Sequence, residues 1–286
     1  MKWFNKIVIL SVWLFIIAVS GCAGLHMMNT NAQTYRNSGC RFYSKGLYDK
    51  AIYYSTKAIE IDPDDADTYI IRGNSYGAKD QYNKALSDYT KAIEIKPEYA
   101  EAYYNRGLAY YKKDKLYESI SDFNEAIKIK PNYAEAYHNR GCAYYCAKQL
   151  DEAISNFNKA IEINPDISVT YFNRGSVYEI KGQIIEAISD FKKVIDINPG
   201  SVEAYTSRGS IFHINNQYDN AIFEYNKAID INSEFNMAYY NRARSYFMKK
   251  EYDNALVDVN KAQELESNCS VDYFGLLESL REVMGR

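Results

Sequence analysis

Residues that commonly build catalytic sites are scarce in this sequence. Only three of its 286 residues are histidines, and it contains no glycine-rich loop of the kind that binds phosphate groups. No two carboxylates are placed as a pair that could share an apolar cleft, which leaves little material for an active site. The sequence therefore predicts a protein that is not an enzyme and that needs no cofactor.

An excess of positive charge is also missing. The formal net charge is −3 at neutral pH. Proteins that bind the phosphate backbone of DNA or RNA need a concentrated basic surface, because most of their affinity comes from neutralising phosphates. We therefore expect no nucleic acid among the main partners.

Long apolar runs are absent except at the start of the chain. Residues 7–19 are apolar apart from one serine, and Lys2 and Lys6 precede them. A membrane-spanning helix needs roughly 20 apolar residues, so this run is too short for one. A basic start followed by a short apolar run is typical of a secretory signal peptide. We expect residues 1–21 to be that signal peptide.

The residues that follow the apolar run resemble the lipobox of bacterial lipoproteins. The segment reads Val19-Ser20-Gly21-Cys22. The resemblance implies that Cys22 receives a diacylglycerol and becomes the new N-terminus, and several acyl chains there would give stable anchoring. Residues 22–31 would then be the lipidated N-terminus and a short tether. The alternative is an uncleaved anchor with an incidental cysteine.

The lipoprotein resemblance also implies a location. Ala23 follows the cysteine, and the absence of aspartate there resembles the sorting pattern for the outer membrane in Gram-negative bacteria. We therefore expect a protein of the cell envelope that is attached to a membrane by lipid. The membrane would be the outer one if the organism is Gram-negative.

Proline is rare but regularly spaced, and other residues share its period. The five prolines follow one another at intervals of 34 residues, from Pro63 to Pro199, and an Arg-Gly pair recurs at the same interval from Arg72-Gly73 onward. Such a fixed period indicates a stack of repeated units and not a domain with a single core.

Each repeated unit contains two helical patterns. In the copy that begins at Ala100, rings and a glycine follow a spacing of four and three residues, and in its second half Ser119, Phe123 and Ala126 do the same. This spacing places the residues on one face of a helix. A polar turn separates the two halves, and the proline prevents the second helix from continuing. Every unit is therefore predicted to be a pair of amphipathic helices.

This order of an aromatic residue, glycine, tyrosine, alanine, a second aromatic residue, alanine and proline resembles the tetratricopeptide repeat family. The resemblance implies an all-α fold, a right-handed α-solenoid of helix-turn-helix units. The seven repeats are expected at residues 32–65, 66–99, 100–133, 134–167, 168–201, 202–235 and 236–269. Local departures from the pattern are Ser55, Ala243, Gln263, Ser233 and Ser267.

The segment after the last repeat has helical spacing of its own. Phe274, Leu277, Leu280 and Val283 would lie on one face of a helix. Solenoids need a terminal element that covers the exposed apolar face of the last unit. We expect residues 270–286 to form that capping helix.

An arginine column has a polar partner at a constant distance along the chain. Arg72, Arg106, Arg140, Arg174, Arg208 and Arg242 are each followed 16 residues later by Asp88, Asp122, Asn156, Asp190, Glu224 and Asp258. These residues are interpreted as structural pairs that join the two helices of a repeat, not as an anion site.

The binding residues are expected on the first helix of each repeat. In the family, the position two residues after the repeated tyrosine faces the concave surface, where amides could form a ladder along the backbone of an extended peptide. Those amides are Asn37, Asn105, Asn139, Asn173 and Asn241. The alternative is that asparagine is only a common residue at a solvated position, and both interpretations remain open.

Aromatic side chains beside the amides would supply contact area for a partner. They are Tyr104, Tyr111, Tyr145, Phe172 and Tyr240, and acids at Asp67, Glu101, Glu135 and Glu203 border them. The sequence thus predicts a scaffold that binds a protein or an extended peptide with apolar and basic residues in a concave groove. The basic residues that would clamp a C-terminal carboxylate are largely missing.

Two other functions stay open, and one cluster of possible metal ligands is too small for a site. The protein could be a structural component of a cell-envelope assembly that uses its edges or convex face, or an accessory subunit of an enzyme. His138, Cys142 and Cys146 follow one helix face, but no fourth ligand is indicated, so no metal site is expected.

Overall fold

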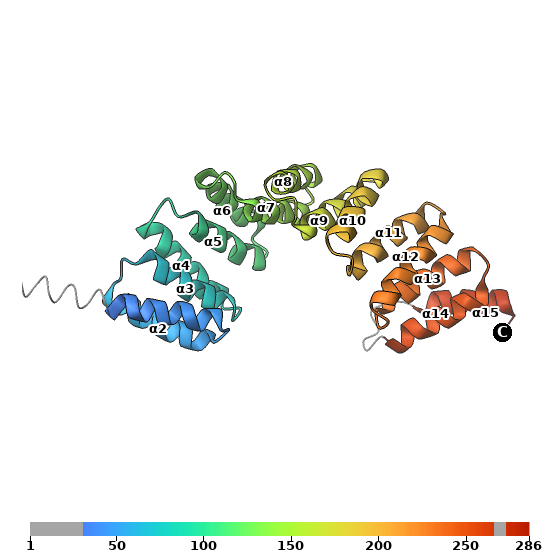
Figure 1. Cartoon of the computed structure of the whole chain (residues 1–286), viewed down its shortest axis with the longest axis horizontal. Helices are drawn as coiled ribbons and strands as arrows, with labels where there is room; N and C mark the ends of the chain where they lie inside the picture. Colours follow the sequence, from blue (N-terminus) through green and yellow to red (C-terminus); the bar gives the residue numbers. More distant parts are fainter. Residues whose placement is uncertain (1–30, 266–272, 286) are drawn as a thin grey trace, which may run out of the picture. The chain divides into compact units, whose positions relative to one another are not determined.

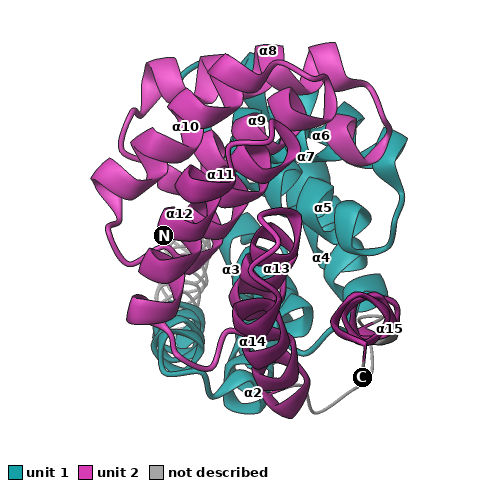
Figure 2. Ribbon diagram, turned by 90° about the vertical axis from the view of Figure 1, so that its right-hand side faces the viewer, with its two compact units in different colours: residues 1–143 teal, residues 144–286 magenta. Residues whose placement is uncertain are grey.

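The computed structural model describes residues 31–265 and 273–285, and every regular element within them is a helix (Figure 1). The expected signal peptide, Cys22 and Cys269 lie outside the described residues. The chain divides into two compact units, residues 1–143 and 144–286, which are coloured separately in Figure 2. Each unit is described by itself below.

The first described element of unit 1 is a helix over residues 31–44. The helices that follow in this unit are α2 (Tyr48–Ile61), α3 (Ala66–Gly77), α4 (Tyr82–Ile95), α5 (Ala100–Lys112), α6 (Leu116–Ile129) and most of α7 (Ala134–Cys146). The helices of unit 2 are α8 (Leu150–Ile163), α9 (Ser168–Ile180), α10 (Ile184–Ile197), α11 (Val202–Ile214), α12 (Tyr218–Ile231), α13 (Asn236–Met248), α14 (Tyr252–Leu265) and α15 (Tyr273–Met284).

Helices pack in the order in which they follow one another. In unit 1, α3 packs against α4 and α4 against α5, and in unit 2 the same holds from α8 to α15. A first helix such as α5 or α11 therefore contacts its own second helix and the second helix of the preceding pair. This arrangement confirms the predicted all-α architecture of stacked helix pairs.

Glycines at the helix crossings allow this close approach. A Cβ atom added at Gly73 would lie 2.6 Å from Cε1 of Tyr89, and one added at Gly107 would lie 2.9 Å from Cε1 of Phe123. Both contacts are too short for real atoms, so the ring can pack there only because the side chain is missing. Ala243 is the exception, and it shares a buried cluster with Val259, which stands where other copies have the ring.

The turn after each first helix contains a residue in the left-handed region. Its φ angle is +57° at Asp80, +58° at Asp114 and +70° at Gly182, and lysines take the same conformation at Lys148 and Lys250. Glycine takes this conformation freely, and aspartate and asparagine tolerate it better than most side chains. The turn inside each pair is thus set by backbone geometry, whereas the proline lies after the second helix.

Five of the six predicted arginine pairs are confirmed, and their contacts extend further than expected. Arg106 donates from Nε and Nη2 to the two carboxylate oxygens of Asp122 at 2.8 Å each. Arg72, Arg174, Arg208 and Arg242 make ion pairs with Asp88, Asp190, Glu224 and Asp258. The six arginines of this column are called the clamp arginines below: Arg72, Arg106, Arg140, Arg174, Arg208 and Arg242.

The clamp arginines also reach back to the preceding pair. Nη1 of Arg106 donates to Oγ1 of Thr90 at 3.2 Å. The corresponding acceptors of Arg72, Arg140, Arg174 and Arg242 are Thr56, Asn124, Asn158 and Asn226. Each of these arginines therefore joins two neighbouring repeats, a role that the sequence analysis does not predict.

One junction in unit 2 lacks these links. The residue 16 positions before Arg208 is Lys192, which cannot accept a hydrogen bond, and Nε of Arg208 is buried without a partner among the described residues. A second kind of link joins Lys249 to Asp219 at 2.7 Å across the next junction, but the equivalent residues here are Asn215 and Ile185. The junction of α10 with α11 is therefore joined mainly by apolar contacts.

The end of unit 2 is covered by α15. Tyr273, Leu277 and Leu280 are buried in one cluster with Ala255 and Val259 of α14. The segment expected to cap the array thus packs its apolar face on the last helix pair. None of the helices within the described residues combines the length and the apolar character that crossing a bilayer requires.

Candidate functional site

A crevice of about 270 Å³ opens between the first helices of unit 1. Its apolar lining comes from Tyr43, Gly77, Tyr82, Tyr89, Leu108 and Ala109. We call the surface formed by the solvent-facing side chains of the first helices the first-helix face, and the matching surface of the second helices the second-helix face. The crevice lies in the first-helix face, with the rings of α4 at its base.

Three polar side chains complete the lining. Tyr89 donates its hydroxyl hydrogen to Oδ1 of Asn74 at 2.8 Å, which fixes the ring, and burial raises the pKa of Tyr89 so that the phenol stays neutral. Nδ2 of Asn105 is buried without an acceptor among the described residues. Lys112 is exposed at the rim. The crevice therefore offers rings, an amide donor and a positive charge.

Only part of this lining is predicted from the sequence. Asn105 is expected as a binding residue, but Tyr82 and Tyr89 are not. A signal exists in one column, where Tyr43 and Tyr111 stand one repeat before and after Gly77. Gly77 has no side chain where these two neighbouring copies have a ring, and Glu179 is the other residue of this column without a ring.

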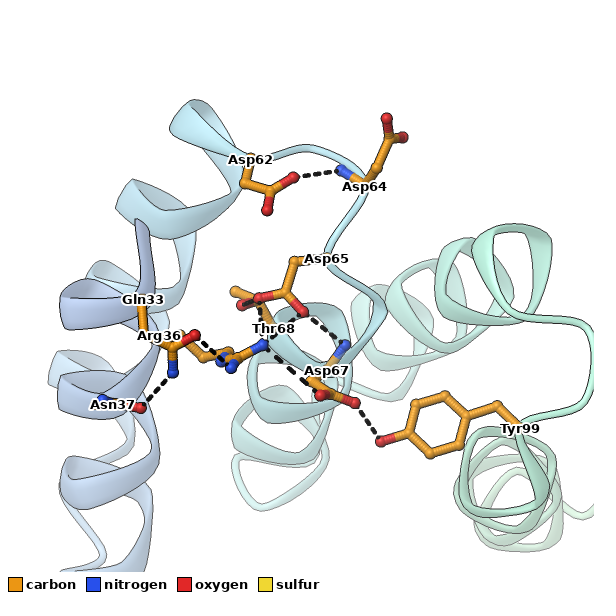
Figure 3. Close-up of polar contacts among 9 residues, drawn as sticks. All are labelled: Gln33, Arg36, Asn37, Asp62, Asp64, Asp65, Asp67, Thr68 and Tyr99. Atoms are coloured by element: carbon orange, nitrogen blue, oxygen red, sulfur yellow. Dashed lines mark hydrogen bonds and ion pairs between the residues drawn. The ribbon is translucent and has the colours of Figure 1, made fainter. Parts of the chain in front are cut away.

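The asparagines proposed as a ladder have different surroundings. Asn37 is exposed and its Oδ1 accepts from Nε2 of Gln33 at 2.9 Å (Figure 3). Asn139 donates from Nδ2 to the Tyr104 hydroxyl at 3.0 Å and to the backbone oxygen of Glu135 at 2.9 Å. Asn173 and Asn241 are half-buried in unit 2. Asn105 is the member whose amide donor faces the crevice.

Asp67, the first of the four acids expected to border the groove, has charged and polar neighbours. Nη1 of Arg36 lies 3.0 Å from Oδ2 of Asp65 and 3.6 Å from Oδ2 of Asp67 (Figure 3). Oδ1 of Asp67 also accepts from the hydroxyl of Tyr99 at 2.7 Å. Arg36 and Tyr99 therefore already balance the negative charge of Asp67. Glu101, in contrast, is exposed on α5.

The predicted aromatic residues of unit 1 are partly packed. The ring of Tyr104 lies 4.9 Å from that of Tyr133 and 5.9 Å from that of Phe123, between centroids. Burial raises the pKa of Tyr104 to about 12, and its hydroxyl accepts from Asn139. The structure thus brings Tyr104 and Asn139 together through one hydrogen bond. Tyr111 is half-buried.

In unit 2, Phe172 lines a second crevice of about 230 Å³, with Val194 at its base and Glu203 at its rim. The ring of Phe172 meets that of Phe191 edge to face at 5.4 Å. Tyr145 is 38% exposed. The ring of Tyr240 meets Tyr273 of α15 edge to face at 5.2 Å, so the end helix already occupies one side of it.

His138 and Cys142 on α7 are in contact, but two ligands are too few to hold a metal ion. Sγ of Cys142 lies 3.6 Å from Nε2 of His138, and burial lowers the pKa of His138, which favours the neutral imidazole. Within residues 31–265 and 273–285, no three His, Cys, Asp or Glu residues gather in a way that could hold a metal ion.

Comparison with known families finds matches along most of the array. A model described as TPR repeat matches residues 73–114 and 209–250, and models described as tetratricopeptide repeat match residues 32–65, 100–133, 134–167, 156–189 and 238–269. No curated protein sequence matches the chain.

Several solved structures are similar to this chain. MamA is 31% identical with a TM-score of 0.53, and the match covers 56% of this chain and 94% of MamA. YrrB, described as a TPR protein with an unusual peptide-binding site, is 28% identical with a TM-score of 0.55, over 64% of this chain and 95% of YrrB. A tetratricopeptide repeat protein from Parabacteroides merdae is 18% identical with a TM-score of 0.63, over 90% of this chain and all of the other.

Proposed function

Because the chain belongs to the tetratricopeptide repeat family, we propose that it is a non-catalytic scaffold that binds a partner protein or an extended peptide on its first-helix face. The crevice of unit 1 is the observation that supports this most directly. It combines tyrosine rings with an amide donor that has no acceptor among the described residues. Buried donors of this kind are rare in folded proteins, because an unmade hydrogen bond is costly.

The charges beside the crevices support a partner with apolar and basic residues. Glu101 and Glu135 are exposed on the first helices of unit 1, and Glu203 borders the crevice of unit 2. Such rim charges affect the rate of association and the choice of partner more than the affinity. YrrB, a similar structure, is described as having a peptide-binding site.

A structural role in an envelope assembly is the second candidate. It is favoured by apolar side chains exposed on second helices, where Tyr117 is 76% exposed, Phe223 is 57% exposed and Val257 is 68% exposed. Such residues could contact other subunits through the second-helix face.

Site-specific photo-crosslinking in the native cells distinguishes the two. A photoreactive amino acid would replace Lys112 on the first-helix face or Tyr117 on the second-helix face, both of which are exposed in unit 1. The scaffold proposal expects discrete protein adducts from position 112 and few from position 117. Adducts from position 117 alone would favour the envelope-assembly role and contradict the scaffold proposal.

We further propose that a lipid on Cys22 holds the scaffold to a membrane of the cell envelope. The proposal rests on the N-terminal sequence, since these residues lie outside the described part of the chain. The wild-type protein should sediment with membranes and incorporate labelled palmitate, and Cys22→Ser should do neither. A Cys22→Ser variant that keeps both properties would exclude lipidation at this residue.

A further inference from the structure

We propose that the crevice of unit 1 recognises one aromatic side chain of the partner, next to an acidic residue. This inference rests on the proposed function and specifies which chemistry the first-helix face selects. Gly77 carries the argument, because it stands where the preceding and following copies have Tyr43 and Tyr111.

The packing of the protein itself does not require glycine at this position. A Cβ atom added at Gly77 would meet only Oη of Tyr89, at 3.6 Å, which is an ordinary contact. At Gly73, one turn earlier, the added atom would meet Cε1 of Tyr89 at 2.6 Å. Gly73 is therefore needed for packing, whereas Gly77 is not.

Nor does the backbone require it. Gly77 is the last residue of α3, and the left-handed residue of the following turn is Asp80. Neither packing nor a left-handed backbone conformation therefore accounts for glycine at the place where the missing ring opens the crevice.

The space left by the missing ring fits a ring from a partner. The crevice measures about 270 Å³, and a buried apolar cavity of about 150 Å³ is known to accept benzene. Tyr43, Tyr82 and Tyr89 line it, and aromatic side chains favour other rings through edge-to-face and offset contacts. A phenylalanine or tyrosine side chain therefore matches both its size and its lining.

Polar groups around the crevice specify what accompanies the ring. Nδ2 of Asn105 has no acceptor among the described residues and can bind a backbone carbonyl of the partner. Lys112 contributes to the lining, and no ion pair to it is present in the described part of the chain. An acidic residue beside the aromatic one would pair with this ammonium group.

The charges on α5 also give the partner a direction. Glu101, Asn105, Leu108 and Lys112 are spaced four, three and four residues apart, so they follow one stripe of the helix. Glu101 and Lys112 are about 16 Å apart along the axis, at 1.5 Å per residue. A bound segment would place basic residues toward Glu101, its ring in the crevice, and its acidic residue toward Lys112.

Binding of a labelled peptide, fluorescein-Lys-Gly-Phe-Asp-Gly-Ser-amide, to the full chain in detergent tests the inference by fluorescence anisotropy. Gly77→Tyr fills the crevice and should weaken binding by about tenfold or more. Gly77→Ala should have a smaller effect. Glu179→Tyr is the matched control, because it puts the same ring at the same repeat position of α9 in unit 2, and it should bind like the wild type.

Two further comparisons identify the chemistry. Changing the probe from Phe to Ala should weaken binding to the wild type as strongly as Gly77→Tyr does. Lys112→Glu should weaken binding of the Phe-Asp peptide and strengthen that of the matching Phe-Lys peptide. Thermal unfolding should show Gly77→Tyr to be at least as stable as the wild type, so that lost binding is not lost folding.

The inference is overturned if Gly77→Tyr binds the probe as the wild type does, if the Ala probe binds equally well, or if the wild type binds none of the peptides at millimolar concentration. Photo-crosslinking from position 135, which is exposed on the first helix α7 and leaves Lys112 in place, separates this failure from failure of the proposed function. Adducts that persist in Gly77→Tyr would keep the scaffold role and exclude the aromatic pocket.

Discussion

Replacing Asp122 by alanine should destabilise the protein more than any exposed charge substitution. Asp122 is 5% exposed and accepts both of its hydrogen bonds from Arg106 at 2.8 Å. Its removal leaves a guanidinium group whose side chain is only 19% exposed, with Thr90 at 3.2 Å and the ring of Tyr103 at 5.6 Å as remaining contacts. Breaking a fully buried pair costs about 3–5 kcal/mol. Because these contacts and some water remain, we expect about 2–4 kcal/mol.

Urea unfolding followed by circular dichroism measures this loss. Glu118→Ala is the control, since Glu118 pairs with Lys115 at 3.2 Å with both side chains about half-exposed, and it should change stability little. Asp122→Asn should fall between them, because an amide keeps one acceptor and the fourth repeat has Asn156 at this position. If Asp122→Ala unfolds at the same urea concentration as Glu118→Ala, the buried pair is not the stabilising contact described above.

Three other perturbations follow from the structure. Lys192→Asn supplies the missing acceptor for Arg208 and should raise the free energy of unfolding by about 0.5–1.5 kcal/mol in urea titrations; no gain would mean that the junction does not admit the link. Gly107→Ala places a Cβ atom 2.9 Å from Phe123 and should cost about 1–3 kcal/mol; combined with Phe123→Val it should cost less than the sum of the two single changes, whereas simple additivity would contradict the contact. Burial lowers the pKa of His138, so the folded state binds its proton less readily than the unfolded chain, and stability should fall as the pH drops below about 6.5. His138→Phe should reduce that fall between pH 7 and pH 5 in thermal unfolding, and an unchanged pH profile would rule out this histidine as a cause.

The repeat architecture could be predicted because it depends on local spacing. Gly107 and Phe123 are separated by 16 residues in the sequence, and their contact explains why one column is small and the other aromatic. The same reasoning explains Ala243 as a change that accompanies Val259. Pairs such as Arg106 with Asp122 join the same two helices, and the constant spacing of 16 residues predicted them.

The contacts between repeats were harder to predict. Thr90 belongs to a column of polar residues that are common at solvated positions. Only the packed structure shows that an arginine of the next repeat donates to it. Likewise, the sequence does not show that the amide of Asn139 donates a hydrogen bond to the Tyr104 hydroxyl of the preceding copy. Whether a side chain is available to a partner depends on its neighbours one repeat away.

The sequence predicted which helices carry the candidate site but not where on them the crevice lies. The first helices were expected to carry the binding residues, and Asn105 does line the crevice of unit 1. The crevice itself depends on the missing side chain at Gly77. The sequence shows that this side chain is missing, but only the structure shows that no other residue fills the space. Tyr240, in contrast, has Tyr273 of α15 against its ring, a contact across more than 30 residues that periodicity does not reveal.

The clamp arginines also bear on how such a chain can change length during evolution. Every link they make joins residues 16 positions apart, whether inside one repeat or across a junction. Duplication of a complete 34-residue copy that carries a threonine or asparagine acceptor would place each arginine opposite an acceptor again. One residue inserted inside a helix, in contrast, would turn the arginine by about 100° to another face of that helix and break its link.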